Sequence, residues 1–314
     1  MSAVEPLPDG LQAALRRRLR EKQVYGIAVC GFDRDGIRFV GGVGHADLAR
    51  GEPVEPTTVF RVASISKLLT ATLVLRLVDD GELSLDGPVN DLLPEELAIK
   101  DGDDRPVDVS LRSMLSHSSG LPYGLRGTDA GNRVLSRLAN QGRVRDLADA
   151  IRGLRLTHEP GTKIVYSNPA YNVLGHVAAE RAGRSFEAAS RSQVLQPLGM
   201  VDSAFGHRQG PGVATPYGSL FPPAVSDRPV DRMRLIATPM GGLTTTVLDL
   251  ARFGRMVLNG GELDGRRFLD PATVAEATST QARNHPALEQ GYGLGFKTRR
   301  WRGRDLVGHD GNMP

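Results

Sequence analysis

Two side chains suited to nucleophilic chemistry stand three residues apart in the segment Ser64-Ile65-Ser66-Lys67. The apolar run Leu68 to Val78 follows without glycine or proline, which predicts a buried helix. If this helix begins at or just before Ser64, the Ser64 hydroxyl and the Lys67 amine lie on one face, one turn apart. Burial disfavours the charged form of a lysine, so such an amine can take the hydroxyl proton. The helix N-terminus also offers unpaired N–H groups to a developing oxyanion.

The Ser-x-x-Lys pattern is short and occurs by chance in many chains. A serine at a helix start commonly acts only as an N-cap, accepting a hydrogen bond from a backbone N–H. The interpretation of Ser64 as a nucleophile therefore depends on what the rest of the chain supplies.

Composition and charge restrict the class of protein. The chain has 314 residues, of which 40% are hydrophobic and 24% charged, as in globular proteins with a substantial core. The formal net charge of +3 is too small to indicate nucleic-acid binding. The run Arg16-Arg17-Arg18 falls on an expected helix with leucines every four residues and is interpreted as a solvated face, not a membrane or RNA contact.

Other absences in the sequence set further expectations. Cys30 is the single cysteine, so the chain has no internal disulfide. No apolar run reaches transmembrane length and the N-terminus lacks a signal-peptide core, which predicts a cytoplasmic protein without membrane insertion. The seven histidines show no metal-ligand spacing. We expect no metal and no cofactor.

The expected strands cluster at the two ends of the chain and the expected helices in its middle. Strands are predicted at Tyr25–Phe32, Ile37–Val43, Gly291–Phe296 and Asp305–His309, and helices at Pro169–Ala182, Phe186–Val194, Val247–Leu258 and within Arg133–Leu154. Ser110 and Asp270 are expected to cap two further helices. This order predicts an α+β fold, with an antiparallel sheet built from both chain ends and a mostly helical insertion. The active site is expected at their junction.

Three motifs in order resemble the serine β-lactamase and penicillin-binding-protein superfamily, closest to its class C β-lactamase and esterase branch. Ser64-Ile65-Ser66-Lys67 resembles the nucleophile motif, Tyr166-Ser167-Asn168 the Tyr-x-Asn motif, and His309-Asp310-Gly311 the His-x-Gly form of the third motif. The stretches Leu115 to Pro122 and Gly241 to Ala251 also resemble the family. The resemblance covers nearly the whole chain. It implies a β-lactamase-like fold, in which helices flank the antiparallel sheet.

The resemblance implies a role for each site residue. Ser64 would form an acyl-enzyme, and Lys67 and Tyr166 would share the work of the base as a coupled pair. Which of the two takes the Ser64 proton stays open. Asn168 would orient Lys67 or donate to the substrate amide. The N–H of Asn312 would complete an oxyanion hole with that of Ser64.

The third motif also carries expectations. Gly311 would let the backbone approach the substrate closely. His309 would contact substrate, although a plain strand histidine fits the residue type equally well. His117 is interpreted as a hydrogen-bonding core residue; a Ser-His-Asp triad using it lacks the strand–turn–helix elbow around the serine. Lys297-Thr298-Arg299 is set aside as a third motif because its last residue is arginine.

The resemblance also implies how the chain is divided into domains. The chain is expected to form one β-lactamase-like domain over 1–314, with a sheet subdomain of residues 1–62 and 238–314 and a helical subdomain of residues 63–237. In the family, further strands and a C-terminal helix follow the third motif, and we expect these to be missing from a chain that stops at Pro314. The segments Pro197–Pro239 and Gly124–Val134 are expected to shape the substrate pocket.

We therefore predict a serine hydrolase that acts on a small-molecule ester, amide or lactam through a Ser64 acyl-enzyme. Esterase or D-amino-acid peptidase activity is favoured over β-lactamase activity, because His309 replaces a lysine that would bind a β-lactam carboxylate. Two alternatives stay open: a penicillin- or peptidoglycan-binding module without turnover, and an inactive truncated fragment. The sequence does not predict an oligomeric state.

Overall fold

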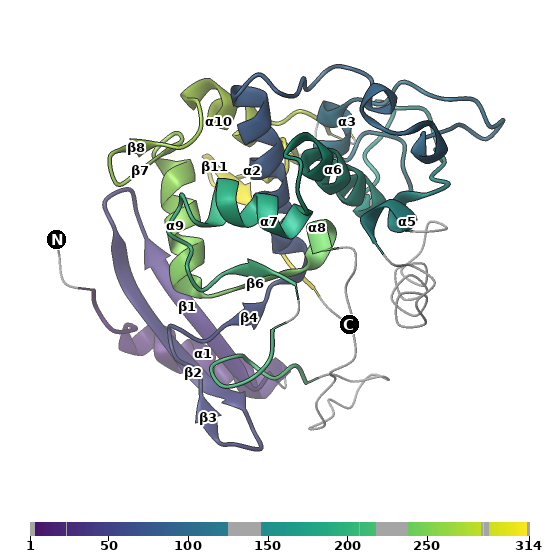
Figure 1. Ribbon diagram of the computed structural model, residues 1–314. Coiled ribbons are helices and arrows are strands. Elements are labelled where there is room, and N and C mark those ends of the chain that lie inside the picture. Colours follow the sequence, from purple (N-terminus) through teal and green to yellow (C-terminus); the bar gives the residue numbers. More distant parts are fainter. Residues whose placement is uncertain are drawn as a thin grey trace.

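The computed structural model describes residues 4–22, 24–124, 146–206, 208–217, 238–283, 285 and 289–312. Most helices gather in one half of the molecule, and antiparallel strands from both ends of the chain lie against them (Figure 1). The predicted α+β class is confirmed.

The helix predicted behind Ser64 is confirmed and lies at the centre of the fold (Figure 1). A 3-10 turn, Ala63–Ile65, leads directly into helix α2, Ser66–Asp79. Every residue of α2 from Ser66 to Leu75 is buried, so the helix has no solvated face. Helices α6, Asn168–Arg181, and α8, Thr238–Gly241, pack on it. An all-round apolar composition is what such a central position requires.

Two further helices begin at the caps predicted for them. Ser110 accepts a hydrogen bond from the Ser113 N–H, and Asp270 accepts one from the Ala272 N–H, so both predicted caps are confirmed. The other helices are α1 Asp9–Lys22, α3 Leu111–Leu115, α5 Leu147–Ile151, α7 Phe186–Ser190, α9 Val247–Leu258 and α10 Pro271–Thr278, with 3-10 turns at Val89–Leu92 and Glu95–Leu97 and a π-helical turn at Arg191–Leu195.

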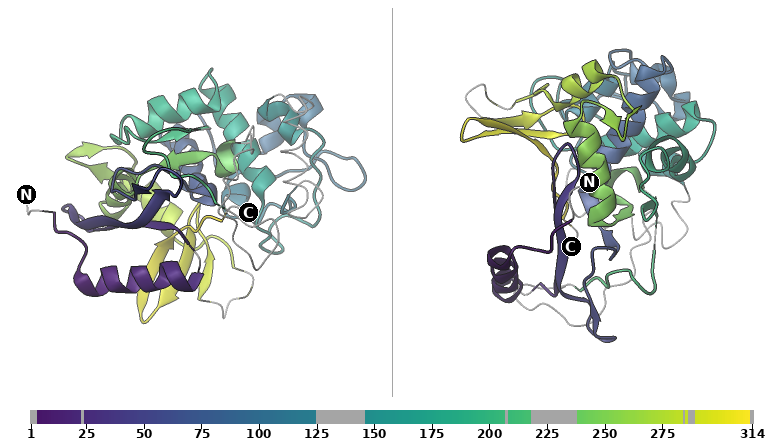
Figure 2. Two further views of the ribbon diagram at one scale, coloured as in Figure 1. Left: turned by 90° about the horizontal axis from the view of Figure 1, so that it is seen from below. Right: turned by 90° about the vertical axis from the view of Figure 1, so that its left-hand side faces the viewer.

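The N-terminal strands form an antiparallel sheet in the order β1-β2-β3, with β1 Gly26–Phe32, β2 Ile37–Asp47 and β3 Glu52–Pro53. Helix α1 lies on one side of this hairpin and α9 on the other (Figure 2). Helix α9 packs closely against β1 at Gly254: a Cβ added to this glycine would lie 2.2 Å from the Phe32 ring. A side chain at residue 254 would push the two elements apart.

Two small sheets connect distant parts of the chain. β4 Phe60–Arg61 and β5 Ala204–Phe205 both pair with β6 Leu243–Thr245, and β7 Glu262–Leu263 pairs with β8 Arg266–Arg267. Because β4 directly precedes the Ser64 turn, its pairing with β6 places that turn beside α8.

The C-terminal strands differ from the prediction. The strand expected over Gly291–Phe296 is wrong: β9 covers only Gln290–Tyr292, and a second strand, β10 Lys297–Trp301, follows before β11 Arg304–Gly308. The chain bends at Gly295, whose φ is 92° and whose added Cβ would lie 2.3 Å from the Ala71 Cβ. Close contact with α2 at a positive φ needs glycine, and this bend lies between β9 and β10.

The strands of the two chain ends do not form one hydrogen-bonded sheet among the described residues. β9, β10 and β11 form their own antiparallel sheet, in the order β11-β10-β9. The expectation of a single sheet built from both ends is therefore wrong in this part of the chain, because no strand pairs with the outer edge of β1 or of β11 there.

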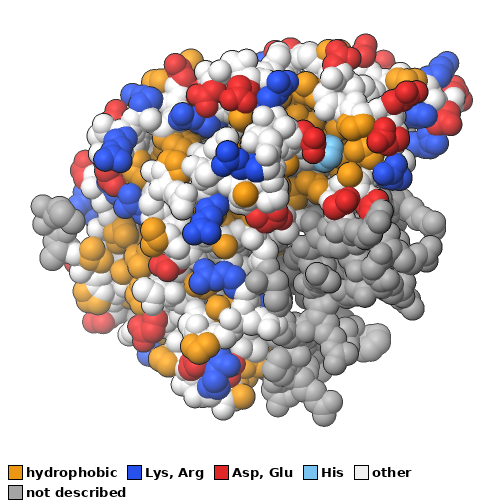
Figure 3. Space-filling view, viewed as in Figure 1, with side chains coloured by type: hydrophobic (Ala, Val, Ile, Leu, Met, Phe, Trp, Pro, Cys, Tyr) orange, Lys and Arg blue, Asp and Glu red, His pale blue; other side chains and the backbone are white. Residues whose placement is uncertain are grey.

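Several expected segments lie partly outside the described residues: 125–134 of Gly124–Val134, 133–145 of Arg133–Leu154, and 207 and 218–237 of Pro197–Pro239. On the face shown in Figure 3, the described basic and acidic side chains are interspersed rather than separated by sign. None of the helices in the described ranges combines the length and apolarity needed to cross a bilayer.

The central position of α2 predicts a large stability cost for truncating it. Leu73 is completely buried in α2, so we expect Leu73→Ala to lower the free energy of unfolding by about 2–5 kcal/mol. Leu258, on α9, is 44% exposed, and Leu258→Ala serves as the control, with a change of about 0.5 kcal/mol or less. Denaturant titration followed by circular dichroism measures both, and equal losses would contradict the central role of α2.

Candidate active site

Ser64 lies in the 3-10 turn between β4 and α2 and is only partly buried, whereas Lys67 one turn later is completely buried. The preceding residue, Ala63, adopts a φ of 46°, which is rare for a side chain with a Cβ. Ser66 holds the turn in place: its hydroxyl donates to the Ala63 carbonyl at 2.5 Å and accepts from the Leu243 N–H at 2.9 Å. The sharp turn at Ser64 is thereby fixed to β6.

The Lys67 amine is within hydrogen-bond distance of three oxygens. Its Nζ lies 3.1 Å from the Ser64 Oγ, 2.8 Å from the Asn168 Oδ1 and 2.6 Å from the Met240 carbonyl. Burial, reinforced by the charge of Lys297, holds the pKa of Lys67 well below the usual lysine value. A neutral amine has two N–H groups for Asn168 and Met240, and its lone pair can then accept the Ser64 proton.

Tyr166 lies beside both residues. Its phenol is hydrogen-bonded to Ser64, and the Lys67 Nζ is 4.9 Å from the centre of its ring. Burial raises the pKa of Tyr166 above the usual tyrosine value, more than the hydrogen bond to Ser64 lowers it. Burial thus favours the uncharged forms of both Tyr166 and Lys67. In these forms the Lys67 amine can accept a proton and the Tyr166 phenol can donate one.

Asn168 joins the group as the first residue of helix α6. Ser167 caps this helix by accepting a hydrogen bond from the Ala170 N–H, and the Asn168 N–H donates to the Tyr123 carbonyl. These contacts direct the nearly buried Asn168 amide towards Lys67.

His117 contacts the backbone around Tyr166. Its carbonyl accepts from the Val165 N–H at 2.9 Å and its Nδ1 accepts from the Ser167 N–H at 3.0 Å. Its ring centre lies 4.4 Å from that of Tyr166. Burial lowers the pKa of His117, so the ring is neutral. Because Nδ1 accepts a hydrogen bond, the ring carries its proton on Nε2. Because its Nδ1 is hydrogen-bonded to the backbone, His117 is a hydrogen-bonding core residue, as the sequence analysis predicts.

The third motif lies near Tyr166. The ring centre of His309 is 6.0 Å from that of Tyr166, and its Nδ1 lies 2.6 Å from the Asp310 carbonyl. Burial lowers the pKa of His309 to about 4, so its ring is uncharged at neutral pH. An added Cβ at Gly311 would lie 2.1 Å from the Val62 carbonyl, which explains the glycine. Asn312 is exposed, and its part in an oxyanion hole stays a prediction.

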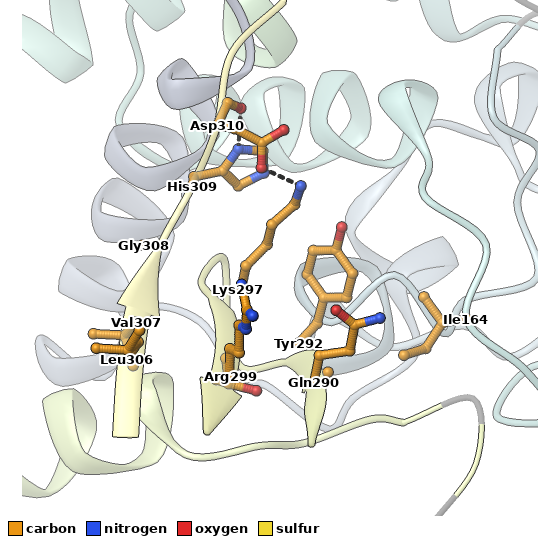
Figure 4. Close-up of a pocket in the computed structure, with 12 residues that line it drawn as sticks. Ile164, Gln290, Tyr292, Lys297, Arg299, Leu306, Val307, Gly308, His309 and Asp310 are labelled. Carbon is orange, nitrogen blue, oxygen red and sulfur yellow. Dashed lines mark hydrogen bonds and ion pairs between the residues drawn. The ribbon is translucent and has the colours of Figure 1, made fainter. Parts of the chain in front are cut away.

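Sequence reasoning missed four contributors to this site. Ser66 and the Met240 carbonyl are seen only through their contacts with residues far along the chain. Tyr292 approaches Tyr166, with ring centres 6.4 Å apart. Lys297, which was set aside with its tripeptide, forms an ion pair with Asp310 of the third motif (Figure 4). The lysine in Lys-Thr-Arg was the one available signal for this last contact.

Comparisons with known proteins identify the family of the chain. The family model described as Beta-lactamase matches residues 11–314. Penicillin-binding protein 4 of Amycolatopsis lactamdurans is 32% identical over 302 residues, which cover 93% of this chain and 75% of that protein. Esterase EstB of Burkholderia gladioli is 35% identical over 215 residues, covering 66% of this chain and 54% of the esterase.

A solved structure extends the similarity to the fold. The octameric penicillin-binding protein homologue from Pyrococcus abyssi superimposes with a TM-score of 0.77 at 26% identity, over 96% of this chain and 68% of that one. The predicted resemblance is confirmed: the chain belongs to the β-lactamase family of serine hydrolases, which includes penicillin-binding proteins and esterases.

Proposed function

We propose that this chain hydrolyses a small-molecule ester or amide through an acyl-enzyme on Ser64, with Lys67 as the base. The observation that carries the proposal is the 3.1 Å separation between the Lys67 Nζ and the Ser64 Oγ. It is supported by the complete burial of an amine whose pKa lies well below its usual value. A nucleophile within hydrogen-bond distance of an unprotonated base is the arrangement that acyl transfer requires.

The reaction follows from the protonation states. Lys67 takes the Ser64 proton as the Oγ attacks the carbonyl carbon, and the carbonyl electrons move to the oxygen. Tyr166, a neutral phenol hydrogen-bonded to Ser64, donates its proton to the leaving group as that bond breaks and regains one from Lys67. A water molecule then attacks the acyl-enzyme by the same route and restores the Ser64 hydroxyl. The N–H groups of Ser64 and Asn312 would stabilise the oxyanion.

Esterase or amidase activity fits the site better than efficient β-lactamase activity. His309 is uncharged at neutral pH, so the third motif itself offers no cation to a β-lactam carboxylate. The similarity to an esterase over 66% of this chain favours the same choice. A penicillin-binding module without turnover is the second candidate, favoured by the similarity to penicillin-binding protein 4.

Covalent labelling tests the nucleophile. A fluorophosphonate should add one adduct to the protein, detected by intact-mass spectrometry, and Ser64→Ala should abolish the adduct and ester turnover because no Oγ remains to attack. Ser118→Ala is the matched control, because it removes a hydroxyl that contacts Ser116 and the Ser113 carbonyl and not Ser64 or Lys67. Labelling that persists in Ser64→Ala would remove Ser64 from the proposal, and a stable penicillin adduct without ester turnover would select the binding-module function.

The phenol has a separate test. Tyr166→Phe removes the hydroxyl but keeps the ring against His117. We expect kcat to fall by roughly 10²–10⁴, the usual contribution of a positioned proton donor. Stopped-flow measurement of acylation separates this step from deacylation. A wild-type acylation rate would leave Lys67 as the sole proton carrier.

The protonation state of Lys67 predicts a pH profile. Only the neutral amine accepts the Ser64 proton, so kcat/KM should rise with pH through an apparent pKa below the usual lysine value. The positive charge of Lys297 contributes to this lowering. Lys297→Met should therefore let Lys67 hold its proton to higher pH and move the rising limb to more alkaline values. A limb that moves to lower pH would contradict the assignment of Lys67 as the base.

A further inference from the structure

The segment that carries Tyr166 is hydrogen-bonded on both sides to one residue, His117. Residues 164–167 form neither helix nor strand, so no regular hydrogen-bond ladder fixes the Tyr166 backbone. Before Tyr166, the Val165 N–H donates to the His117 carbonyl at 2.9 Å. After it, the Ser167 N–H donates to the His117 Nδ1 at 3.0 Å. The position of the Tyr166 backbone therefore depends on the position of His117.

His117 occupies a backbone position that usually holds glycine. It is the second residue after helix α3, and its φ of 59° is left-handed. Its N–H donates to the Met114 carbonyl at 3.2 Å, and the Ser118 N–H donates to the Ser113 carbonyl at 2.8 Å, which is the pattern of a Schellman motif. Glycine is favoured there because a Cβ is strained at a positive φ. A histidine that bears this strain indicates that its side chain makes a contact that glycine cannot make.

The two ring nitrogens of His117 indicate which contact that is. The residue is buried, and its Nε2 has no hydrogen-bond partner among the described residues. A buried N–H without a partner costs free energy that a phenyl ring of similar shape would avoid. The acceptor at Nδ1 is the group that a phenyl ring cannot supply. The hydrogen bond from the Ser167 N–H to this acceptor therefore accounts for the histidine.

The His117 ring also lies against the tyrosine whose backbone it contacts. The ring centres of His117 and Tyr166 are 4.4 Å apart, and Tyr292 contacts the same histidine ring edge-on at 4.7 Å. The Tyr166 phenol is in turn hydrogen-bonded to Ser64. A proton donor acts only within hydrogen-bond distance of the group that it protonates, so a displacement of the Tyr166 ring would slow the reaction.

We propose that His117 is a positioning residue, which holds the Tyr166 phenol beside Ser64 through the hydrogen bonds of its carbonyl and its Nδ1. The proposal rests on the proposed acyl transfer at Ser64 and adds a residue outside the three motifs. The hydrogen bonds that the structure describes for His117 all join backbone groups. His117 therefore acts on the reaction through Tyr166 and is not itself a catalytic residue.

The competing explanation is that the His117 ring only fills space in the core. His117→Phe keeps a ring but has no acceptor. His117→Asn has no ring, but asparagine tolerates a positive φ and places an amide oxygen near the position of Nδ1. The positioning proposal expects activity to be lost in His117→Phe and retained in His117→Asn. A space-filling role expects the reverse order.

Two esters with the same acyl group measure the effect on the proton donor. 4-Nitrophenyl butyrate releases a phenolate that leaves without a proton, whereas ethyl butyrate releases an alkoxide that needs one. The value of kcat/KM reports acylation for both esters. We expect His117→Phe to lower kcat/KM for the ethyl ester by about tenfold or more beyond its effect on the nitrophenyl ester, in the same sense as Tyr166→Phe. His117→Asn should remain close to the wild type for both esters.

A double-mutant cycle separates positioning from a general loss of structure. In a Tyr166→Phe background no phenol remains to be positioned, so His117→Phe should cause little further loss with the ethyl ester. A purely structural role would give the same factor in both backgrounds.

His176→Phe is the matched control. His176 is also buried, and its Nε2 likewise lacks a hydrogen-bond partner in the described structure, but it lies about two turns along α6 from Asn168. This variant should treat the two esters as the wild type does. Equal losses for both esters in His117→Phe, the same loss in both backgrounds, or an equal selective loss in His176→Phe would overturn the proposal.

Amide hydrogen exchange separates this proposal from the proposed function. The Ser167 N–H should exchange faster in His117→Phe than in the wild type, whereas His117→Asn and His176→Phe should leave its exchange slow. If the wild-type protein hydrolyses no ester but this contrast persists, the acyl-transfer proposal fails and the anchoring of Tyr166 by His117 stands. If the wild type hydrolyses both esters and the two His117 variants do not differ, the positioning proposal fails alone.

Discussion

The complete burial of one amine, that of Lys67, governs the arrangement of this protein. A buried ammonium must be paired or lose its charge, and no acidic side chain is among the hydrogen-bond partners that the described residues provide for it. Its partners are instead a hydroxyl, an amide and a backbone carbonyl. They come from three separate segments, the Ser64 turn, the start of α6 and the end of α8, so that the same contacts that satisfy the amine also join the core helices.

The surrounding groups reinforce the uncharged state. Tyr166, Tyr171 and His117 are neutral in their buried positions, because burial raises the pKa of both tyrosines and lowers that of the histidine. The charged groups, Lys297 and Asp310, stand at the exposed edge. A neutral interior beside a charged rim can hold proton donors and acceptors at close distance.

Local patterns predicted most of the elements correctly, since the periodicity and caps of helices such as α2, α6 and α9 depend on neighbouring residues. The three motifs likewise identified Ser64, Lys67, Tyr166 and Asn168, which the structure brings together. The strand at Gly291–Phe296 was predicted wrongly because its bend is imposed by contact with α2. Which strands at the two chain ends pair with one another depends on long-range register, which short patterns do not encode.

The sequence by itself determined the kinds of groups available: a hydroxyl and an amine one helical turn apart, a tyrosine and an asparagine on a second motif, and a histidine on a third. Their types follow from composition and their local spacing from helix geometry. Only the tertiary structure decided their protonation states, because a pKa depends on burial and on charges brought near by folding. It also decided that Lys297, which has no motif of its own, shares a cavity with the third motif, since strand pairing and not sequence distance brings them together.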